Sequence, residues 1–336
     1  MRNKTNLIFL PLLLLSCGEA KANPCFFIYD MNDNFMSSLK DEFSLALKEK
    51  GYEVTTYNAS RKQSTQNTQI GKELELNPKN PLIINIVDRL SASMIIEKAE
   101  KEDTPVLFIN REPLKEDCTK NSWAKENIYY VGADSTYQGE AQSEIASSYF
   151  GEASNFPSSR FDKNNDGKLQ VALFRGELSH QDAENRSKYA LEKLRTLGFK
   201  VDLINVSYCD WEKSLAYEEM KKMYLNGENV ELLLCNNDEM ALGAVEYLKE
   251  KMDVNTPFID QFFPILGVDG TETGKQAVKD GFLLGTVLND AYNQAKILSD
   301  IYLNIVENTP LPIYGEEIKI NDNFYYVKGT KITRNN

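Results

Sequence analysis

The sequence predicts an α/β protein with two doubly wound, Rossmann-like domains, each built around a parallel sheet. Short apolar runs of strand length alternate with amphipathic stretches of helix length, which is the pattern of parallel α/β sheets. This alternation passes through five strands and then begins again. The 336 residues suit two domains of ordinary size. Polar residues follow several predicted strands, at the edge where open parallel sheets bind ligands.

The first domain begins with five predicted strands, which lie at 25–29, 53–57, 82–86, 106–109 and 128–131. Residues 34–50 form a predicted helix between the first two strands. Its apolar residues Phe35, Leu39, Phe43 and Leu47 recur at four-residue spacing, so they share one face.

The second domain repeats the pattern, with strands expected at 169–174, 200–205, 232–235, 265–268 and 284–288. Helices are expected at 181–197 and 239–251. The chain ends with a predicted helix at 291–308 and two short strands, at 317–320 and 324–327.

The N-terminus predicts secretion. Arg2 and Lys4 precede an apolar run at 7–15, and residues 1–17 end in Leu-Leu-Ser-Cys, which together form a secretory signal. Cys17 has the sequence setting of a lipoprotein cysteine that is acylated after cleavage. The alternative is cleavage near Ala22, which would release an unanchored protein. The apolar run is too short for an ordinary spanning helix, so we expect an extracytoplasmic protein with a lipid as its membrane contact.

Charge and cysteine content exclude some classes of partner. The net charge of −12 argues against nucleic acid and anionic lipid, because both need a basic face. Four cysteines follow Cys17, and an even number in an oxidising compartment permits disulfides. Because two of the four lie in apolar strand runs, we predict buried thiols and no essential disulfide. The four residues are Cys25, Cys118, Cys209 and Cys235.

A possible calcium loop precedes the strand at 169–174. Asp162, Asn164 and Asp166 alternate, Gly167 permits a sharp turn, and Gln170 follows, which is the spacing of oxygen ligands in a calcium loop. The twelfth loop position, which carries a glutamate in an EF-hand, is Leu173. A remote carboxylate must therefore complete the site. The alternative is a solvated Asn/Asp/Gly turn.

Polar side chains at predicted strand ends indicate a ligand site between the domains. Each has an alternative as a helix cap or as part of the core. The residues are Asp33, Asn85, His180, Asp182, Asn237, Asp269 and Asn289. His180 is the single histidine, which excludes a multi-histidine zinc site. No GxSxG elbow or glycine-rich phosphate loop accompanies it, so an enzyme is not predicted.

The segment 162–186, DKNNDGKLQVALFRGELSHQDAENR, closely resembles the periplasmic glucose/galactose-binding proteins of bacterial ABC transporters. Further matching stretches are NDNF at 32–35, INIVD at 84–88, YYVGADS at 129–135, LLLCNNDEMALGAVEYL at 232–248, LGVDG at 266–270 and GTVLNDAYNQAK at 285–296. The resemblance implies the type I periplasmic-binding-protein fold, in which two lobes close around a ligand and a three-stranded hinge joins them.

The resemblance also assigns residue roles. Phe35 and Trp211 would sandwich a sugar ring, and its hydroxyls would be bound by Asp33, Asn85, His180, Asp182, Arg186, Asn237, Asp269 and Asn289. A structural calcium ion would be held by side chains of Asp162, Asn164, Asp166, Gln170 and Glu231 and by the carbonyl of Lys168. Residues 25–131 with 289–327 would form the N-terminal lobe, and 132–288 with 328–336 the C-terminal lobe.

The function that the resemblance implies is capture of D-glucose or D-galactose outside the cytoplasmic membrane and delivery to an ABC transporter permease. We expect a monomeric periplasmic lipoprotein. One alternative is a sugar sensor that presents its closed form to a chemoreceptor or sensor-kinase ectodomain. A glycosidase is disfavoured, because a site that encloses one monosaccharide leaves no room for a leaving group.

Two segments, 112–126 and 255–264, are longer than in the family pattern. In the second, an exposed apolar patch could be formed by Phe258, Ile259, Phe262 and Phe263. A lid, a permease contact and local packing are its three alternatives.

Overall fold

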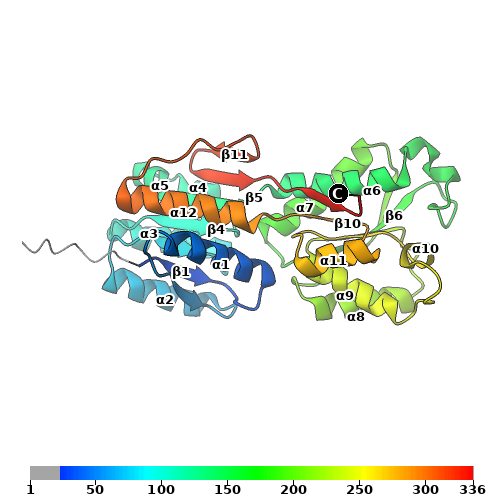
Figure 1. The fold of residues 1–336 in the computed structure, drawn as a ribbon, viewed down its shortest axis with the longest axis horizontal. Helices are drawn as coiled ribbons and strands as arrows, with labels where there is room; N and C mark the ends of the chain where they lie inside the picture. Colours follow the sequence, from blue (N-terminus) through cyan, green and yellow to red (C-terminus); the bar gives the residue numbers. More distant parts are fainter. Residues whose placement is uncertain (1–22, 336) are drawn as a thin grey trace, which may run out of the picture.

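The computed structural model describes residues 23–335, so the signal segment 1–17 and Cys17 lie outside the described residues. Two lobes lie side by side along the long axis of the molecule (Figure 1). Each lobe contains one mostly parallel sheet with helices on both faces, which confirms the predicted fold class.

The N-terminal lobe holds a seven-stranded sheet in the order β11-β12-β5-β4-β3-β1-β2. Every neighbouring pair in it is parallel except β11 and β12. The strands are β1 (Cys25–Ile28), β2 (Thr55–Asn58), β3 (Leu82–Ile84), β4 (Val106–Ile109), β5 (Ile128–Ala133), β11 (Ile318–Asn321) and β12 (Phe324–Val327). The helices of this lobe are α1 (Asn34–Lys48), α2 (Gln63–Leu76), η1 (Arg89–Ser91), α3 (Ala92–Lys101), α4 (Lys115–Cys118), α5 (Ser122–Asn127) and α12 (Ala291–Glu307).

The C-terminal lobe holds a six-stranded sheet in the order β13-β10-β9-β8-β6-β7. Only β13 runs antiparallel to its neighbour. The strands are β6 (Leu169–Arg175), β7 (Val201–Tyr208), β8 (Leu232–Cys235), β9 (Ile265–Leu266), β10 (Gly285–Val287) and β13 (Lys331–Thr333). The helices are α6 (Ser135–Phe150), η2 (Ala153–Ser158), α7 (Gln181–Thr196), α8 (Lys213–Leu225), α9 (Asp238–Lys249), α10 (Phe258–Gln261) and α11 (Glu272–Asp280).

The chain passes between the lobes three times, after β5, after β10 and after β12. Helix α12 thereby returns to the N-terminal lobe, where it packs beside α1 (Figure 1). Strand β13 brings the chain back to the second lobe. Three short connections limit relative motion of two rigid lobes to opening and twisting.

The central strands of both sheets are buried on both faces, which explains why β1, β3, β4, β6 and β8 are mostly apolar runs. In β1, Phe26 and Ile28 pack into one core cluster, while Cys25 and Phe27 pack into the cluster on the opposite face. In β6, Ala172 and Phe174 face one cluster and Val171 and Leu173 the other.

The four cysteines that the structure describes are free and buried, as the sequence predicts. Burial, with the nearby Glu73 carboxylate, raises the pKa of the Cys25 thiol to about 12, so this thiol is a poor nucleophile.

The segment 255–264 differs from the expectation of an exposed patch. Phe258 and Phe263 are buried in the core of the C-terminal lobe, with Phe262 packed against it. The Phe258 ring meets Phe282 edge to face. Local packing is therefore the alternative that holds.

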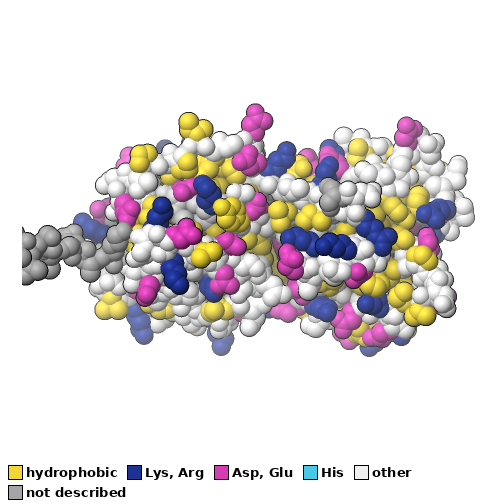
Figure 2. Space-filling model, in the orientation of Figure 1, with side chains coloured by type: hydrophobic (Ala, Val, Ile, Leu, Met, Phe, Trp, Pro, Cys, Tyr) yellow, Lys and Arg dark blue, Asp and Glu magenta, His cyan; other side chains and the backbone are white. Residues whose placement is uncertain are grey.

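Among residues 23–335, no helix is both long and apolar enough to cross a membrane. On the face drawn in Figure 2, hydrophobic side chains are scattered among acidic and basic ones over both lobes.

Candidate functional site

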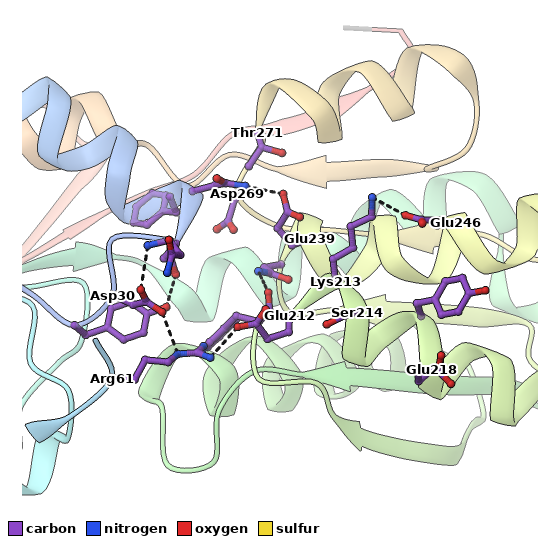
Figure 3. A pocket seen from close by; sticks show the side chains of 18 residues that line it. Asp30, Arg61, Glu212, Lys213, Ser214, Glu218, Glu239, Glu246, Asp269 and Thr271 are labelled. Carbon is purple, nitrogen blue, oxygen red and sulfur yellow. Dashed lines mark hydrogen bonds and ion pairs between the residues drawn. The ribbon is translucent and has the colours of Figure 1, made fainter. Parts of the chain in front are cut away.

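A cleft between the lobes contains two adjoining cavities. The inner chamber is a tight space of about 30 Å³. The outer cavity, about 600 Å³, adjoins it and shares several of its lining residues; Figure 3 shows the side chains that line this outer cavity. The inner chamber draws on both lobes and is lined by Tyr29, Asp33, Phe35, Asn110, Arg111, His180, Asp182, Arg186, Trp211, Asn237, Asp269 and Asn289. These residues lie at or beyond the carboxyl ends of strands, where open parallel sheets bind ligands.

The two aromatic residues expected to hold a ring reach this chamber from opposite lobes. Phe35 comes from the start of α1 and Trp211 from the connection between β7 and α8. The His180 ring meets Trp211 edge to face, with ring centroids 4.9 Å apart. A Cβ atom at Gly176 would lie 2.1 Å from the Trp211 ring, so the indole can occupy this place only beside a glycine.

Arg186 is the buried centre of charge in the chamber. Its Nε donates to Gln138 Oε1 at 2.8 Å and its Nη1 to the Asn236 carbonyl at 2.8 Å. Asp182 Oδ2 lies 3.5 Å and Asp269 Oδ1 4.0 Å from the guanidinium. Burial raises the pKa of both carboxyl groups, and the Arg186 charge opposes that shift. One guanidinium thus holds two acceptor groups at the chamber wall.

Asp33 has two roles at once. Its Oδ1 accepts from Met36 N at 2.9 Å and caps α1, as the capping alternative predicts. Its Oδ2 accepts from the Tyr29 hydroxyl at 2.5 Å. Burial, with the Asp33 charge, raises the pKa of Tyr29. Tyr29 therefore stays a protonated donor.

Two amides complete the wall on the side of the C-terminal lobe. Asn237 caps α9, with its Oδ1 accepting from Met240 N at 2.9 Å. Asn289 donates to Asp269 Oδ1 at 3.2 Å and accepts from Gln294 Nε2 at 2.6 Å. These bonds fix the orientation of both amides, and each keeps unused capacity to donate or accept.

The structure does not bring Asn85 to the chamber. Asn85 is fully buried behind the wall, where its Oδ1 accepts from Tyr29 N at 3.2 Å. Its Nδ2 donates to Asn110 Oδ1 at 3.1 Å. Asn110 lines the chamber instead, so Asn85 orients the neighbouring amide.

Sequence reasoning missed Tyr29, Asn110 and Arg111 as chamber residues. Asn110 and Arg111 directly follow β4, so the strand-end rule that selected the other residues applies to them as well. The Arg111 guanidinium lies 3.7 Å from the centroid of the Tyr29 ring, a cation–π distance.

His180 caps α7, with its Nδ1 accepting from Asp182 N at 3.2 Å. Burial, reinforced by the charges of Arg111, Arg186 and Arg89, holds the pKa of His180 well below 6.5. The ring is therefore neutral at pH 7. Since Nδ1 accepts, Nε2 carries the proton and is the ring's donor for a ligand.

We predict that nitrogen-15 NMR will show a neutral Nε2–H imidazole down to pH values below 6.5. The assignment is direct, because the chain has one histidine. A depressed pKa means that the unfolded chain binds the proton first, so this group lowers stability as pH falls through about 6.5. Titration of the folded ring near 6.5 would contradict the prediction. Denatured protein, in which the ring is solvated, is the control.

The acidic loop at 162–170 lies at the amino end of β6, on the opposite edge of the sheet from the chamber. Asp162 accepts from Asp166 N and Gly167 N, and Glu231 accepts from Lys163 N and Gln170 N. Glu231 thus reaches the loop from the residue before β8.

The loop has some, but not all, of the features of a site for a cation with oxygen ligands. Gln170 Oε1 is buried and has no hydrogen-bond partner, which leaves an oxygen available as a ligand. Within residues 23–335, no group of three Asp, Glu, His or Cys side chains is close enough to hold a metal ion. Asp166 Oδ2 instead accepts from Gln170 Nε2 at 2.9 Å. A cation would therefore depend on amide and carbonyl oxygens as well as on carboxylates.

Comparison with known proteins identifies the family to which this architecture belongs. A family model described as periplasmic binding protein domain matches residues 25–310. The D-galactose/methyl-galactoside binding periplasmic protein of Haemophilus influenzae is 33% identical over 283 residues, covering 83% of this chain and 80% of that protein. The ribose import binding protein of Escherichia coli is 21% identical over 302 residues, covering 89% of this chain and 88% of that protein.

Solved structures show the same fold. An ABC transporter solute binding protein from Bacillus halodurans, with bound myo-inositol, matches with a TM-score of 0.75 and 20% identity, covering 95% of this chain and 97% of that chain. One from Actinobacillus succinogenes, with bound D-allose, also has a TM-score of 0.75, with 16% identity and coverage of 94% and 98%. The family model and the Haemophilus relative together show that the chain belongs to the periplasmic binding protein family, a family of type I fold whose matched members are binding proteins and not enzymes.

Proposed function

We propose that the chain is an extracytoplasmic binding protein that captures D-glucose or D-galactose in the interlobe cleft, where the inner chamber and the outer cavity adjoin, and delivers it to an ABC transporter permease. The observation that carries this proposal is the inner chamber, in which Phe35 and Trp211 from opposite lobes accompany a ring of oriented polar groups. The relative named for D-galactose and methyl-galactoside, 33% identical to this chain, supports the choice of hexose.

The chemistry of the chamber suits a pyranose. Its hydroxyls both donate and accept, and the carboxylates, amides, His180 and Arg186 supply acceptors and donors for them. The C–H face of the ring suits an aromatic surface. Closure makes an unmatched buried polar group costly, so hydrogen bonds give selectivity among sugars.

Calorimetry against a panel of monosaccharides tests the proposal. We expect D-glucose or D-galactose to bind most tightly, with D-ribose and myo-inositol much weaker. Tightest binding of a pentose or polyol, or no binding of either hexose, would contradict it. Heat-denatured protein gives the blank. Uptake of labelled hexose by cells with and without the gene tests delivery.

Two further assignments belong to the proposal. A calcium ion would be held by Asp162, Asn164, Asp166, Gln170, Glu231 and the carbonyl of Lys168, and would supply positive charge that braces this loop against β8. An acyl group on Cys17 would tether a monomeric protein to a membrane. Incorporation of labelled palmitate by the native chain, and its loss in Cys17→Ser, tests the anchor.

A further inference from the structure

Arg61 lies at the mouth of the outer cavity, where the two lobes meet (Figure 3). It belongs to the N-terminal lobe, in the turn between β2 and α2. Its Nη1 lies 2.7 Å from Glu212 Oε1, its Nη2 3.4 Å from Glu177 Oε1, and its Nη2 donates to the Asp210 carbonyl at 3.2 Å. All three partners belong to the C-terminal lobe, so one guanidinium spans the cleft.

The N-terminal lobe presents this guanidinium from a fixed turn. Ser60 and Arg61 both have left-handed backbone angles, with φ of 49° and 61°. Such angles are uncommon for residues other than glycine, and the turn that requires them is held by hydrogen bonds. Arg61 N donates to the Tyr29 carbonyl at 2.7 Å, and Ser60 N donates to Asn58 Oδ1 at 2.9 Å. Asp30 Oδ2 lies 3.4 Å from Arg61 Nε, on the same lobe.

The C-terminal lobe presents carboxylates that pair with the positive charge of Arg61. Glu177 Oε2 lies 2.8 Å from Arg111 Nη1, so two arginines of the N-terminal lobe share Glu177. The outer cavity is rich in acidic side chains, which are Asp30, Asp33, Glu212, Glu218, Glu239, Glu246 and Asp269. Of the two basic residues that line it, Lys213 pairs with Glu246 within the C-terminal lobe.

Closing the cleft therefore brings Asp30 of one lobe toward Glu177 and Glu212 of the other, with Arg61 between them. Without Arg61, the approach of these like charges would oppose closure. The other cross-lobe contacts at the rim include Asn34 with Glu239 at 2.9 Å and Arg89 with Gln181 at 2.7 Å. In each of these two contacts one partner is a neutral amide, whereas Arg61 and Arg111 each pair with a carboxylate of the C-terminal lobe. Arg111 reaches Glu177 alone, so Arg61 is the arginine that pairs with Glu212.

We infer that Arg61 is an affinity-determining residue, whose guanidinium holds the lobes closed over a bound ligand by joining Asp30 to Glu177 and Glu212. This inference rests on the proposed function for the identity of the ligand. The effect of Arg61 on lobe closure is also expected in the ligand-free protein. Because the Arg61 side chain is 36% exposed, salt screens its ion pairs. Dependence of affinity on ionic strength is therefore the signature of this contact.

The test compares Arg61→Gln with the native chain by calorimetry with D-glucose and D-galactose. At about 0.01 M salt, where the Debye length is about 30 Å, we expect the variant to bind roughly tenfold more weakly. At about 1 M salt the difference is expected to disappear, since the Debye length falls to about 3 Å. Lys62→Gln is the matched control: it removes the same charge from the next residue, which is exposed. It is expected to bind like the native chain.

Small-angle X-ray scattering without ligand gives a second measurement. We expect Arg61→Gln to have a larger radius of gyration than the native chain and Lys62→Gln at low salt. Equal affinities and equal radii for Arg61→Gln and Lys62→Gln would overturn the inference. If the native chain bound no hexose, the proposed function would fail, and the scattering comparison would still decide the role of Arg61.

Discussion

Replacing Trp211 by alanine is expected to weaken binding of the preferred hexose by roughly 2 kcal/mol or more, because a desolvated aromatic contact at the centre of a site is a typical hot spot. This corresponds to about a thirtyfold rise in Kd. The indole lines both cavities and packs against His180. Its loss would also leave the His180 ring less confined. Calorimetry with glucose and galactose measures the change.

Two further variants separate stacking from loss of fold. Gly176→Ala is expected to weaken binding as well, because its Cβ would occupy the space of the indole ring. Trp123→Phe is the matched control, since Trp123 is the chain's other tryptophan and its Nε1 donates to Asp103 in the N-terminal lobe. We expect its affinity to equal that of the native chain. Unchanged affinity in Trp211→Ala would remove Trp211 from the site.

The sequence predicted the elements whose pattern is set locally. Strands β4, β8 and β12 begin and end at the predicted residues, because apolar runs buried on both faces have clear limits. Strand β13 was missed. Its three residues are only partly buried, and their strand geometry depends on antiparallel pairing with β10, which is distant in sequence.

The sequence predicted that residues at strand ends line the site, but not which of two neighbouring strand ends supplies the lining residue. Asn85 and Asn110 follow adjacent strands, β3 and β4, and both are amides after an apolar run. Asn110 has a φ of 63°, which asparagine tolerates better than most residues. Which amide lines the chamber depends on this turn and on packing between strands. Tyr29 was also missed. Its hydroxyl donates to Asp33, and that contact exists only once α1 has packed against the sheet.

The phenylalanines of segment 255–264 show a different limit. Their density in a polar stretch indicated an exposed patch, but α10 folds Phe258 and Phe263 onto the lobe. Lys163 fixes this segment by donating from Nζ to the Phe262 carbonyl at 2.6 Å. That bond joins residues 99 apart in the sequence, and no local pattern predicts it.

Calcium is expected to raise the melting temperature, whereas a chelator is expected to lower it. At a free calcium concentration of 100 times Kd, binding to the folded state adds about 2.7 kcal/mol to the free energy of unfolding. For a protein of this size, that corresponds to a rise of several degrees. The ion would balance the charges of Asp162, Asp166 and Glu231. Burial raises the pKa of Glu231, and repulsion by Asp162 and Asp166 adds to that shift.

Differential scanning calorimetry with calcium, magnesium or chelator measures this effect. Glu231→Gln is expected to melt at the same temperature with calcium as with chelator, because it loses the carboxylate that reaches the loop from β8. Glu192→Gln, an exposed change on α7 of the same lobe, is the matched control and should respond like the native chain. Magnesium should have little effect, since it prefers fewer protein oxygens and more water. Identical melting curves in calcium and chelator would contradict the site.

The acidic loop lies far from the chamber, so we expect calcium to leave hexose affinity nearly unchanged. Gln170 and Glu231 lie at the amino ends of β6 and β8, while Gly176 and Asn237 follow the carboxyl ends of the same strands. A loss of cation therefore loosens the edge of the sheet away from the chamber. Since distant sites are usually independent within about 0.5 kcal/mol, we expect hexose affinity in chelator to stay within about twofold of its value in calcium, at a temperature where both forms are folded. A much larger loss of affinity would mean that the loop acts on the chamber through the strands.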